Sequence, residues 1–218
     1  MTLMVRELGL VPYREALGLQ ESLVAQKLAG DADDHLIVLE HEPVYTLGRA
    51  ADEGDLHGAD LRLGVDAIRV GRGGGVTFHG PGQLVAYPVI DLGAFGRDVG
   101  RYVRALEAVL IAVCKRFSVD AVRRPGTPGV WTNDAKIASI GIGIRRWVAF
   151  HGVALNVTTD LSFFTQIVPC RMPDVRVTSL ERESPATPSM ASVRAVFVDE
   201  FLAMVQRCRI ARVHEVHA

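Results

Sequence analysis

Cysteine is scarce in this sequence, and no metal-binding spacing occurs in it. The 218 residues include three cysteines, Cys114, Cys170 and Cys208. An odd number without paired spacing does not form a disulfide framework. Neither a CxxC nor an HExxH pattern is present, so no zinc site is indicated. We therefore expect no metal and no other cofactor, and we expect the protein to work in a reducing, cytoplasmic compartment.

Long apolar runs and an excess of charge are also missing. No segment approaches the roughly 20 apolar residues that cross a bilayer. The N-terminus lacks a basic region followed by an apolar core, so we expect neither export nor a membrane anchor. The 24 Lys and Arg balance 25 Asp and Glu, which argues against a nucleic-acid partner. Length and a hydrophobic content of 49% fit one globular domain over residues 1–218.

Hydrophobic periodicity predicts an α+β chain. Strands and helices do not alternate strictly, which favours helices packed on a mixed, mainly antiparallel sheet over a doubly wound parallel sheet. Asn133-Asp134 lies between two strand patterns and predicts a two-residue hairpin turn, and Ser189 is a candidate cap for the helix that follows it. The predicted helices cover 13–28, 98–117 and 190–206, and the predicted strands cover 36–39, 66–70, 84–90, 129–132, 136–144 and 147–157.

Glycine is concentrated in one segment, Gly71-Arg72-Gly73-Gly74-Gly75, which lies between the strands predicted for 66–70 and 84–90. Glycines at such a place allow a backbone to approach a ligand closely, and a bulge or tight turn is the alternative. The spacing fits neither a dinucleotide fingerprint nor a phosphate-binding P-loop. His79 and Gln83 follow within HGPGQ. They indicate a pocket wall, although a purely structural histidine is the other interpretation.

Cys170 is the candidate for a reactive thiol. It follows Pro169 in an irregular stretch, where reactive groups are commoner than in core strands. The neighbouring Arg171 favours a thiolate. Cys114 lies instead on the apolar face of the helix predicted for 98–117, where we expect an inert side chain. Local sequence leaves a structural role for Cys170 open.

Lys136 is the candidate partner of that thiol. Strict alternation along a strand puts it on the face of Ala138, Ile140, Ile142 and Ile144, opposite the small residues Ser139, Gly141 and Gly143. Partial desolvation favours the neutral amine, so a lysine there exchanges protons near neutral pH. The alternative is a lysine that follows a turn and points into solvent.

Four segments together resemble the lipoyl(octanoyl) transferase family, which transfers octanoyl groups from acyl carrier protein to proteins. Arg171 is a departure, because this family usually has Gly after the cysteine. The matching segments are Glu40-His41-Glu42-Pro43-Val44-Tyr45-Thr46-Leu47-Gly48-Arg49, Arg72 to Gln83, Lys136 to Gly141 with Phe150-His151-Gly152-Val153-Ala154-Leu155-Asn156, and Pro169-Cys170.

This resemblance implies a fold shared with biotin and lipoate protein ligases. It implies that Cys170 is the nucleophile that becomes an acyl thioester, and that Lys136 is the general acid and base. Val76, Phe78, Ile140 and Ile142 are candidates for the wall of an apolar acyl tunnel. The implied acyl-binding residues are Arg72, Gly73, Gly74, Gly75, Val76, Thr77, Phe78, His79, Ser139, Ile140, Gly141, Gly152, Val153 and Ala154.

The resemblance also implies the partners. The donor is octanoyl-acyl carrier protein, and the acceptors are lipoyl domains of 2-oxoacid dehydrogenase E2 subunits and the glycine cleavage H protein. Such partners are acidic, so a rim of arginines could assist docking, whereas scattered surface arginines are the alternative. The candidate rim comprises Arg123, Arg124, Arg145, Arg146, Arg171 and Arg176.

Two other functions remain to be separated from this one. An ATP-dependent lipoate or biotin protein ligase would share the fold, activate a free acid as an adenylate and need no cysteine. A non-catalytic module that binds acyl carrier protein would keep the pocket and lack the chemistry.

Overall fold

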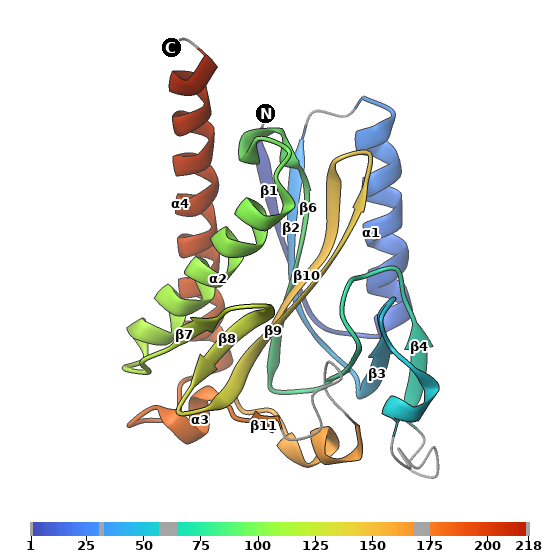
Figure 1. Ribbon diagram of the computed structural model, residues 1–218, viewed down its shortest axis with the longest axis vertical. Helices are drawn as coiled ribbons and strands as arrows, with labels where there is room; N and C mark the ends of the chain where they lie inside the picture. Colours follow the sequence, from blue (N-terminus) through green and yellow to red (C-terminus); the bar gives the residue numbers. More distant parts are fainter. Residues whose placement is uncertain (1, 31–32, 57–64, 168–174, 217–218) are drawn as a thin grey trace.

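A computed structural model describes residues 2–30, 33–56, 65–167 and 175–216. Its main sheet has eight strands (Figure 1). Most neighbouring strands in this sheet are antiparallel; within the described residues, the parallel pairs are β1 with β2 and β9 with β11. The order is β1 (Leu3–Val11), β2 (Asp34–His41), β6 (Gln83–Asp91), β10 (Val148–Asn156), β9 (Ala135–Arg145), β8 (Thr127–Thr132) and β7 (Val122–Arg124), with β11 (Arg176–Val177) beside β9.

A second, three-stranded sheet lies beside the main one. Its order is β4 (Asp66–Arg69), β3 (Val44–Leu47) and β5 (Val76–His79). All residues of β3 and β5 are buried. The short elements are the helix α3 (Leu180–Glu183) and the 3-10 helices η1 (Glu53–Asp55), η3 (Leu92–Phe95) and η4 (Leu161–Gln166).

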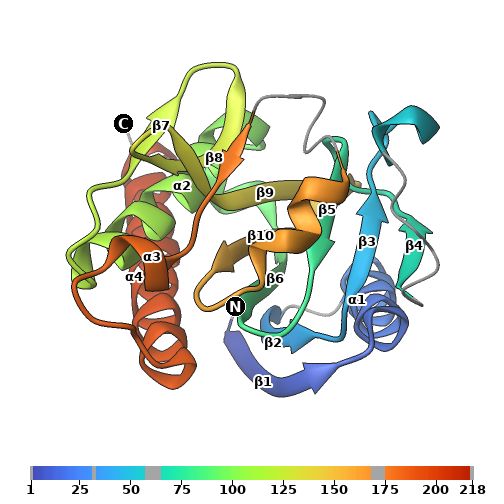
Figure 2. The same cartoon turned by 90° about the horizontal axis from the view of Figure 1, so that it is seen from below.

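Helices cover both faces of the main sheet (Figures 1 and 2). α2 (Val99–Arg116) and α4 (Met190–Val216) lie on one face, and α1 (Tyr13–Leu28) lies on the other. α2 presents Leu106, Leu110 and Val113 to the sheet at helical spacing. The sheet is therefore sandwiched between two apolar cores, and the expected α+β class is confirmed. No helix within the described ranges is long and apolar enough to cross a membrane.

The helix predictions are confirmed, and one helix is longer than expected. α1 has the predicted bounds, and α2 differs by one residue at each end. Ser189 Oγ accepts a hydrogen bond from the Ser192 N–H at 3.1 Å, as a cap should. α4 continues past residue 206, and Arg209 in the added part contacts Asp34 Oδ2 at 2.7 Å. Because Lys27 binds the other oxygen of that carboxylate at 2.8 Å, one buried acid links α1, β2 and α4.

The predicted hairpin is also confirmed. Asn133 and Asp134 have φ angles of 44° and 64° between β8 and β9, in the left-handed region that a two-residue hairpin turn uses. β1, β3, β5, β7 and β11 have no counterpart among the predicted strands. Cys170 and Arg171 lie outside the described residues.

Candidate functional site

The glycine loop packs on the part of β9 that continues beyond its pairing with β8, which ends at Ser139. The Gly73 N–H donates to the Ile142 carbonyl at 2.9 Å. A Cβ on Gly48 would lie 2.3 Å from the Gly74 carbonyl, and one on Gly141 would lie 2.9 Å from Arg72 Cδ. Gly74 itself has a φ of 83°. Gly48 and Gly141 thus allow close packing against the loop, and Gly74 provides a turn, while Gly73, Gly74 and Gly75 also line a cavity.

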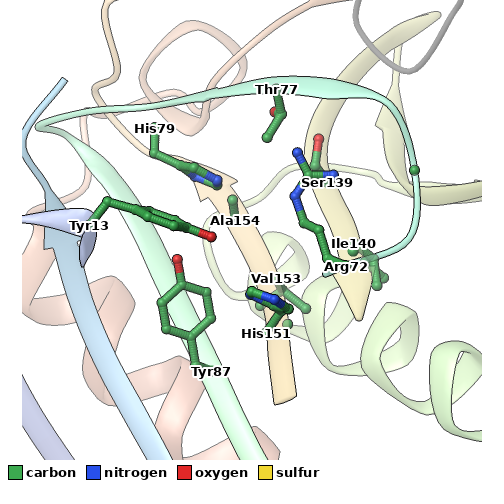
Figure 3. A pocket seen from close by; sticks show the side chains of 13 residues that line it. Tyr13, Arg72, Thr77, His79, Tyr87, Ser139, Ile140, His151, Val153 and Ala154 are labelled. Carbon is green, nitrogen blue, oxygen red and sulfur yellow. The ribbon is translucent and has the colours of Figure 1, made fainter. Parts of the chain in front are cut away.

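Two adjoining cavities open on either side of this loop. We call them the histidine cavity and the lysine cavity. Gly74, Ile140 and Gly141 line both, so the two adjoin at those residues. The histidine cavity is lined by Tyr13, Arg72, Gly74, Thr77, His79, Tyr87, Ser139, Ile140, Gly141, His151, Gly152, Val153 and Ala154 (Figure 3). The lysine cavity is lined by Ala50, Gly73, Gly74, Gly75, Val103, Gly126, Thr127, Pro128, Lys136, Ile140, Gly141 and Ile142.

The cavities differ in size and in chemistry. The lysine cavity has a volume of about 290 Å³, and apolar side chains and glycine backbone form most of its wall. The histidine cavity has a volume of about 30 Å³, and its wall carries two tyrosines, two histidines and an arginine. It is thus a narrow channel with polar side chains.

Hydrogen bonds fix the polar wall beside the glycine loop. Arg72 Nη2 donates to the Thr46 carbonyl and to Thr46 Oγ1, both at 2.7 Å. Thr46 Oγ1 donates to His79 Nε2 at 3.3 Å, and His79 Nδ1 donates to Gln83 Oε1 at 2.7 Å. His79 therefore has a defined tautomer and a fixed ring orientation.

The same network continues to the strand of Lys136. Gln83 Nε2 donates to Asn156 Oδ1 at 2.9 Å, and Asn156 Nδ2 donates to the Thr178 carbonyl at 3.0 Å. The Thr178 N–H donates to the Lys136 carbonyl at 3.0 Å. An unbroken series of hydrogen bonds thus connects the glycine loop with the β9–β11 pair.

A second network closes the histidine cavity on the side of α1. His41 Nδ1 donates to the Val11 carbonyl at 2.8 Å, and the Tyr87 hydroxyl donates to His41 Nε2 at 2.7 Å. The hydroxyls of Tyr13 and Tyr87 share a hydrogen bond. Burial raises the pKa of Tyr13 to about 12, although the nearby Arg72 opposes the shift. Both tyrosines are therefore neutral hydrogen-bonding groups at neutral pH.

His151 reaches this cavity because β10 is locally distorted. Its φ is 55°, and it lies where β10 passes Pro88 of β6, a residue without an N–H to donate to the ladder. Its own N–H donates to Gln20 Oε1 of α1 at 2.8 Å. A Cβ on the next residue, Gly152, would lie 2.2 Å from the Ala86 carbonyl, so only glycine fits there. The imidazole consequently lies on the α1 face of the sheet, near Tyr87.

The three histidines around the cavity are neutral near pH 7. Burial lowers the pKa of His41 to about 4. Burial, with the charges of Arg72 and Arg49, lowers the pKa of His151 to about 4. Burial and the neighbouring His41 and Arg72 hold the pKa of His79 well below its usual value. Each ring therefore offers one donor and one acceptor.

These shifts predict acid sensitivity. The unfolded chain binds protons on these histidines below about pH 6.5, whereas the folded chain resists protonation until about pH 4, so the free energy of unfolding falls as pH drops through that window. We expect a loss of about 2 kcal/mol for each of His41 and His151 between pH 7 and pH 5. Urea unfolding at pH 7 and pH 5 measures this difference in the free energy of unfolding. In His151→Asn the difference should shrink, and an equal difference in the variant would contradict the prediction.

Lys136 is buried, with 4% of its surface exposed. A β-bulge precedes Ala138: Val130 pairs with Ala138 but Trp131 pairs with Lys136, which leaves Ile137 as the extra residue. The strict alternation expected for this strand is therefore interrupted. Lys136 still lines a cavity with Ile140 and Ile142, and it does not point into solvent as the alternative required.

The surroundings of the Lys136 ammonium are aromatic and tight. Nζ lies 5.6 Å from the centroid of the Trp131 ring. Gly129 has a φ of 133°, and a Cβ there would lie 2.7 Å from Lys136 Cε and 3.4 Å from Nζ. Glycine at 129 therefore gives the lysine side chain room to lie along β8, level with Ser139, which pairs with Gly129.

Most of the implied acyl-binding residues line one of the cavities. Val76 and Phe78 do not: they are packed in a core with Tyr45, and Phe78 stacks on Phe163 at 4.3 Å between ring centroids. Their role as tunnel wall is therefore not supported by the cavity linings. Gly73 and Gly75 line the lysine cavity. The remaining implied residues line the histidine cavity: Arg72, Gly74, Thr77, His79, Ser139, Ile140, Gly141, Gly152, Val153 and Ala154.

Tyr13, Tyr87 and His151 are site residues that the sequence analysis did not select. His151 belongs to a matching segment, and its position directly before Gly152 was the available signal. Tyr13 and Tyr87 carry no motif; only the fold shows that α1 and β6 bring their hydroxyls together.

The candidate docking arginines are partly used within the chain. Arg123 contacts Glu107 at 3.1 Å, and Arg124 pairs with Asp134 and lies 4.4 Å above the Trp131 ring. Arg171 lies outside the described residues. Among residues 2–30, 33–56, 65–167 and 175–216, no three His, Cys, Asp or Glu side chains are grouped to hold a metal ion.

A family model and sequence relatives indicate one family, and a solved structure shares the fold. The family model of the lipoyl protein ligase A/B catalytic domain matches residues 12–202. The octanoyltransferase of Geotalea uraniireducens is 49% identical over 205 residues, which cover 91% of this chain and 94% of that relative. The bi-partite lipoate protein ligase of Thermoplasma acidophilum has a TM-score of 0.70 at 19% identity, over 94% of this chain and 84% of that one.

A biotin protein ligase from Aquifex aeolicus, solved with biotin and ATP, shares the fold more distantly. Its TM-score is 0.54 at 11% identity, over 95% of this chain and 72% of that one. The expected likeness to both kinds of ligase fold is thus confirmed.

Proposed function

Because the chain belongs to the lipoyl protein ligase A/B catalytic domain family, we propose that it transfers an octanoyl group from acyl carrier protein to a lysine of lipoyl domains. The chain is an acyltransferase, as its relatives named octanoyltransferase are. The observation that carries the proposal is the buried amine of Lys136 in an apolar cavity that adjoins a narrow channel.

The acyl chain is bound across the two cavities. The thioester lies in the lysine cavity, and the chain passes Gly74, Ile140 and Gly141 into the histidine cavity. The small residues at this junction let a methylene chain pass between backbones. Burying about six methylenes contributes roughly 5 kcal/mol of gross binding free energy.

In the first step, Cys170 Sγ attacks the thioester carbonyl carbon of the octanoyl donor. The bond to the carrier sulfur breaks, and Lys136 protonates the leaving thiolate. A new thioester forms on Cys170. The exchange is nearly isoenergetic because one thioester replaces another, and thiolates serve well both as nucleophiles and as leaving groups.

In the second step, the amine of an acceptor lysine attacks that thioester. Lys136 removes the proton that the attacking nitrogen must lose, an amide forms, and the Cys170 thiolate leaves. One group thus acts first as acid and then as base. Conversion of a thioester to an amide runs downhill, so the cycle needs no ATP.

The described ends of the segment that contains Cys170 support its role. Phe163 and Phe164 of η4 pack on Phe78 shortly before the segment. After it, Val177 of β11 pairs in parallel with Lys136 itself. The described chain therefore ends beside this aromatic core and resumes at the strand that pairs with the proposed acid and base, seven positions after Cys170.

A transfer assay without ATP tests this function. We expect purified protein to octanoylate a lipoyl domain from octanoyl-acyl carrier protein alone, read by the mass of the lipoyl domain. Free octanoate with ATP should give no product. Product from octanoate and ATP only would favour a ligase, and no product in either mixture would favour the non-catalytic module.

A further inference from the structure

The histidine cavity has polar side chains in its wall, although the proposed substrate tail is a hydrocarbon. The His151 side chain belongs to a residue only 1% exposed, and neither Nδ1 nor Nε2 has a hydrogen-bond partner among the described residues. Figure 3 shows this ring below Ala154, beside Tyr87 and Val153. A buried imidazole without partners is unfavourable unless water or ligand satisfies it.

The position of this imidazole is enforced by its surroundings. A left-handed backbone is uncommon for a histidine, and here the Gln20 side chain holds the His151 N–H. Gln20 is itself fully buried and donates to the Ala16 carbonyl. The cavity therefore holds a rigid polar group, since α1 and β10 both define where the ring lies.

The spacing between this ring and the lysine exceeds the length of the substrate chain. Lys136 Nζ lies beside Gly129 of β8, which pairs with Ser139, and His151 of β10 pairs with Ile142. Three residues along β9 span about 10 Å and the two strand spacings from β8 to β10 span about 10 Å, so the two positions lie about 14 Å apart. An extended eight-carbon chain spans about 9 Å, from carbon–carbon bonds near 1.5 Å. A chain whose carbonyl lies by the lysine therefore ends short of His151.

We propose that His151 limits the length of the acyl chain, because a chain longer than octanoyl would meet its polar ring. This role rests on the proposed function. An octanoyl chain ends short of the imidazole and leaves its hydrating water in place. A longer chain displaces that water and leaves the ring nitrogens without hydrogen bonds. At an apolar end, by contrast, each added methylene would improve binding about fourfold.

Two variants separate polarity from size. His151→Leu removes the polar group and keeps a similar volume, whereas His151→Asn keeps polarity in a smaller side chain that tolerates positive φ. The measurement is kcat/KM for decanoyl relative to octanoyl carrier. We expect this ratio to rise about tenfold or more in His151→Leu and to stay within about threefold of wild type in His151→Asn. A rise in His151→Asn without one in His151→Leu would show a steric stop and overturn the proposal.

A test on the wild-type protein covers the case in which leucine at this strained position prevents folding. Nonanoyl and 8-hydroxyoctanoyl thioesters have the same number of chain atoms, but only the second ends in a hydroxyl. We expect the hydroxylated chain to be transferred at least as fast, because it can hydrogen-bond to the imidazole. Slower transfer would overturn the proposal.

The octanoyl control keeps the two proposals apart. A wild-type protein that transfers no octanoyl group contradicts the proposed function. A wild-type protein that transfers octanoyl groups, with the decanoyl ratio unchanged in His151→Leu, contradicts only the role of His151.

Discussion

Replacing Cys170 by Ser should reduce octanoyl transfer by about 10⁴-fold or more, because a serine alkoxide is scarce at neutral pH. Cys170→Ala should do the same. Intact-mass measurement after mixing with octanoyl-acyl carrier protein should show one octanoyl group on the wild-type protein and none on Cys170→Ala. Transfer assays with a lipoyl domain give the rates.

Cys208→Ser provides the matched control. Among the described residues, Cys208 is the cysteine that is partly accessible, since it lies half-buried on α4 whereas Cys114 is fully buried. Burial raises the pKa of both thiols, which disfavours their thiolates. We expect Cys208→Ser to form the adduct and to turn over like wild type. An adduct that persists in Cys170→Ala would assign the nucleophile to another residue.

Local periodicity was sufficient for the elements that carry a strong one-sided pattern. α2 buries Tyr102, Leu106 and Val113 on one face, and its predicted bounds are off by one residue at each end. The hairpin at Asn133 depends only on two residues that accept positive φ. These features need no distant partner, so the sequence alone predicts them.

Features that depend on a distant partner were not predictable in this way. β1 exposes most of its side chains and has an irregular register between Glu7 and Gly9, so it lacks a clear alternation. The bulge before Ala138 follows from pairing with β8. The site has the same limit: His151 reaches the cavity through a hydrogen bond to Gln20, 131 positions away, and no local pattern encodes that contact.

Replacing Lys136 by Arg should slow the complete cycle by about 10²- to 10⁴-fold, the range expected when a general acid and base is lost. A guanidinium stays protonated at any pH that the protein tolerates, so it cannot accept the proton of the attacking amine. Lys136→Met should be similarly slow, because a thioether neither donates nor accepts that proton. Lys115→Arg, on the exposed side of α2, is the control and should retain wild-type rates.

The two steps should respond differently to the loss of Lys136. A carrier thiolate leaves without full protonation, so Cys170 should still become acylated, although more slowly. An attacking amine, in contrast, must lose a proton before a stable amide forms. The Lys136 variants should therefore accumulate the octanoyl adduct in single-turnover mass measurements while the lipoyl domain stays unmodified. Rapid decay of the adduct to product in Lys136→Met would show that another group removes the proton, and the assignment of the base would then have to change.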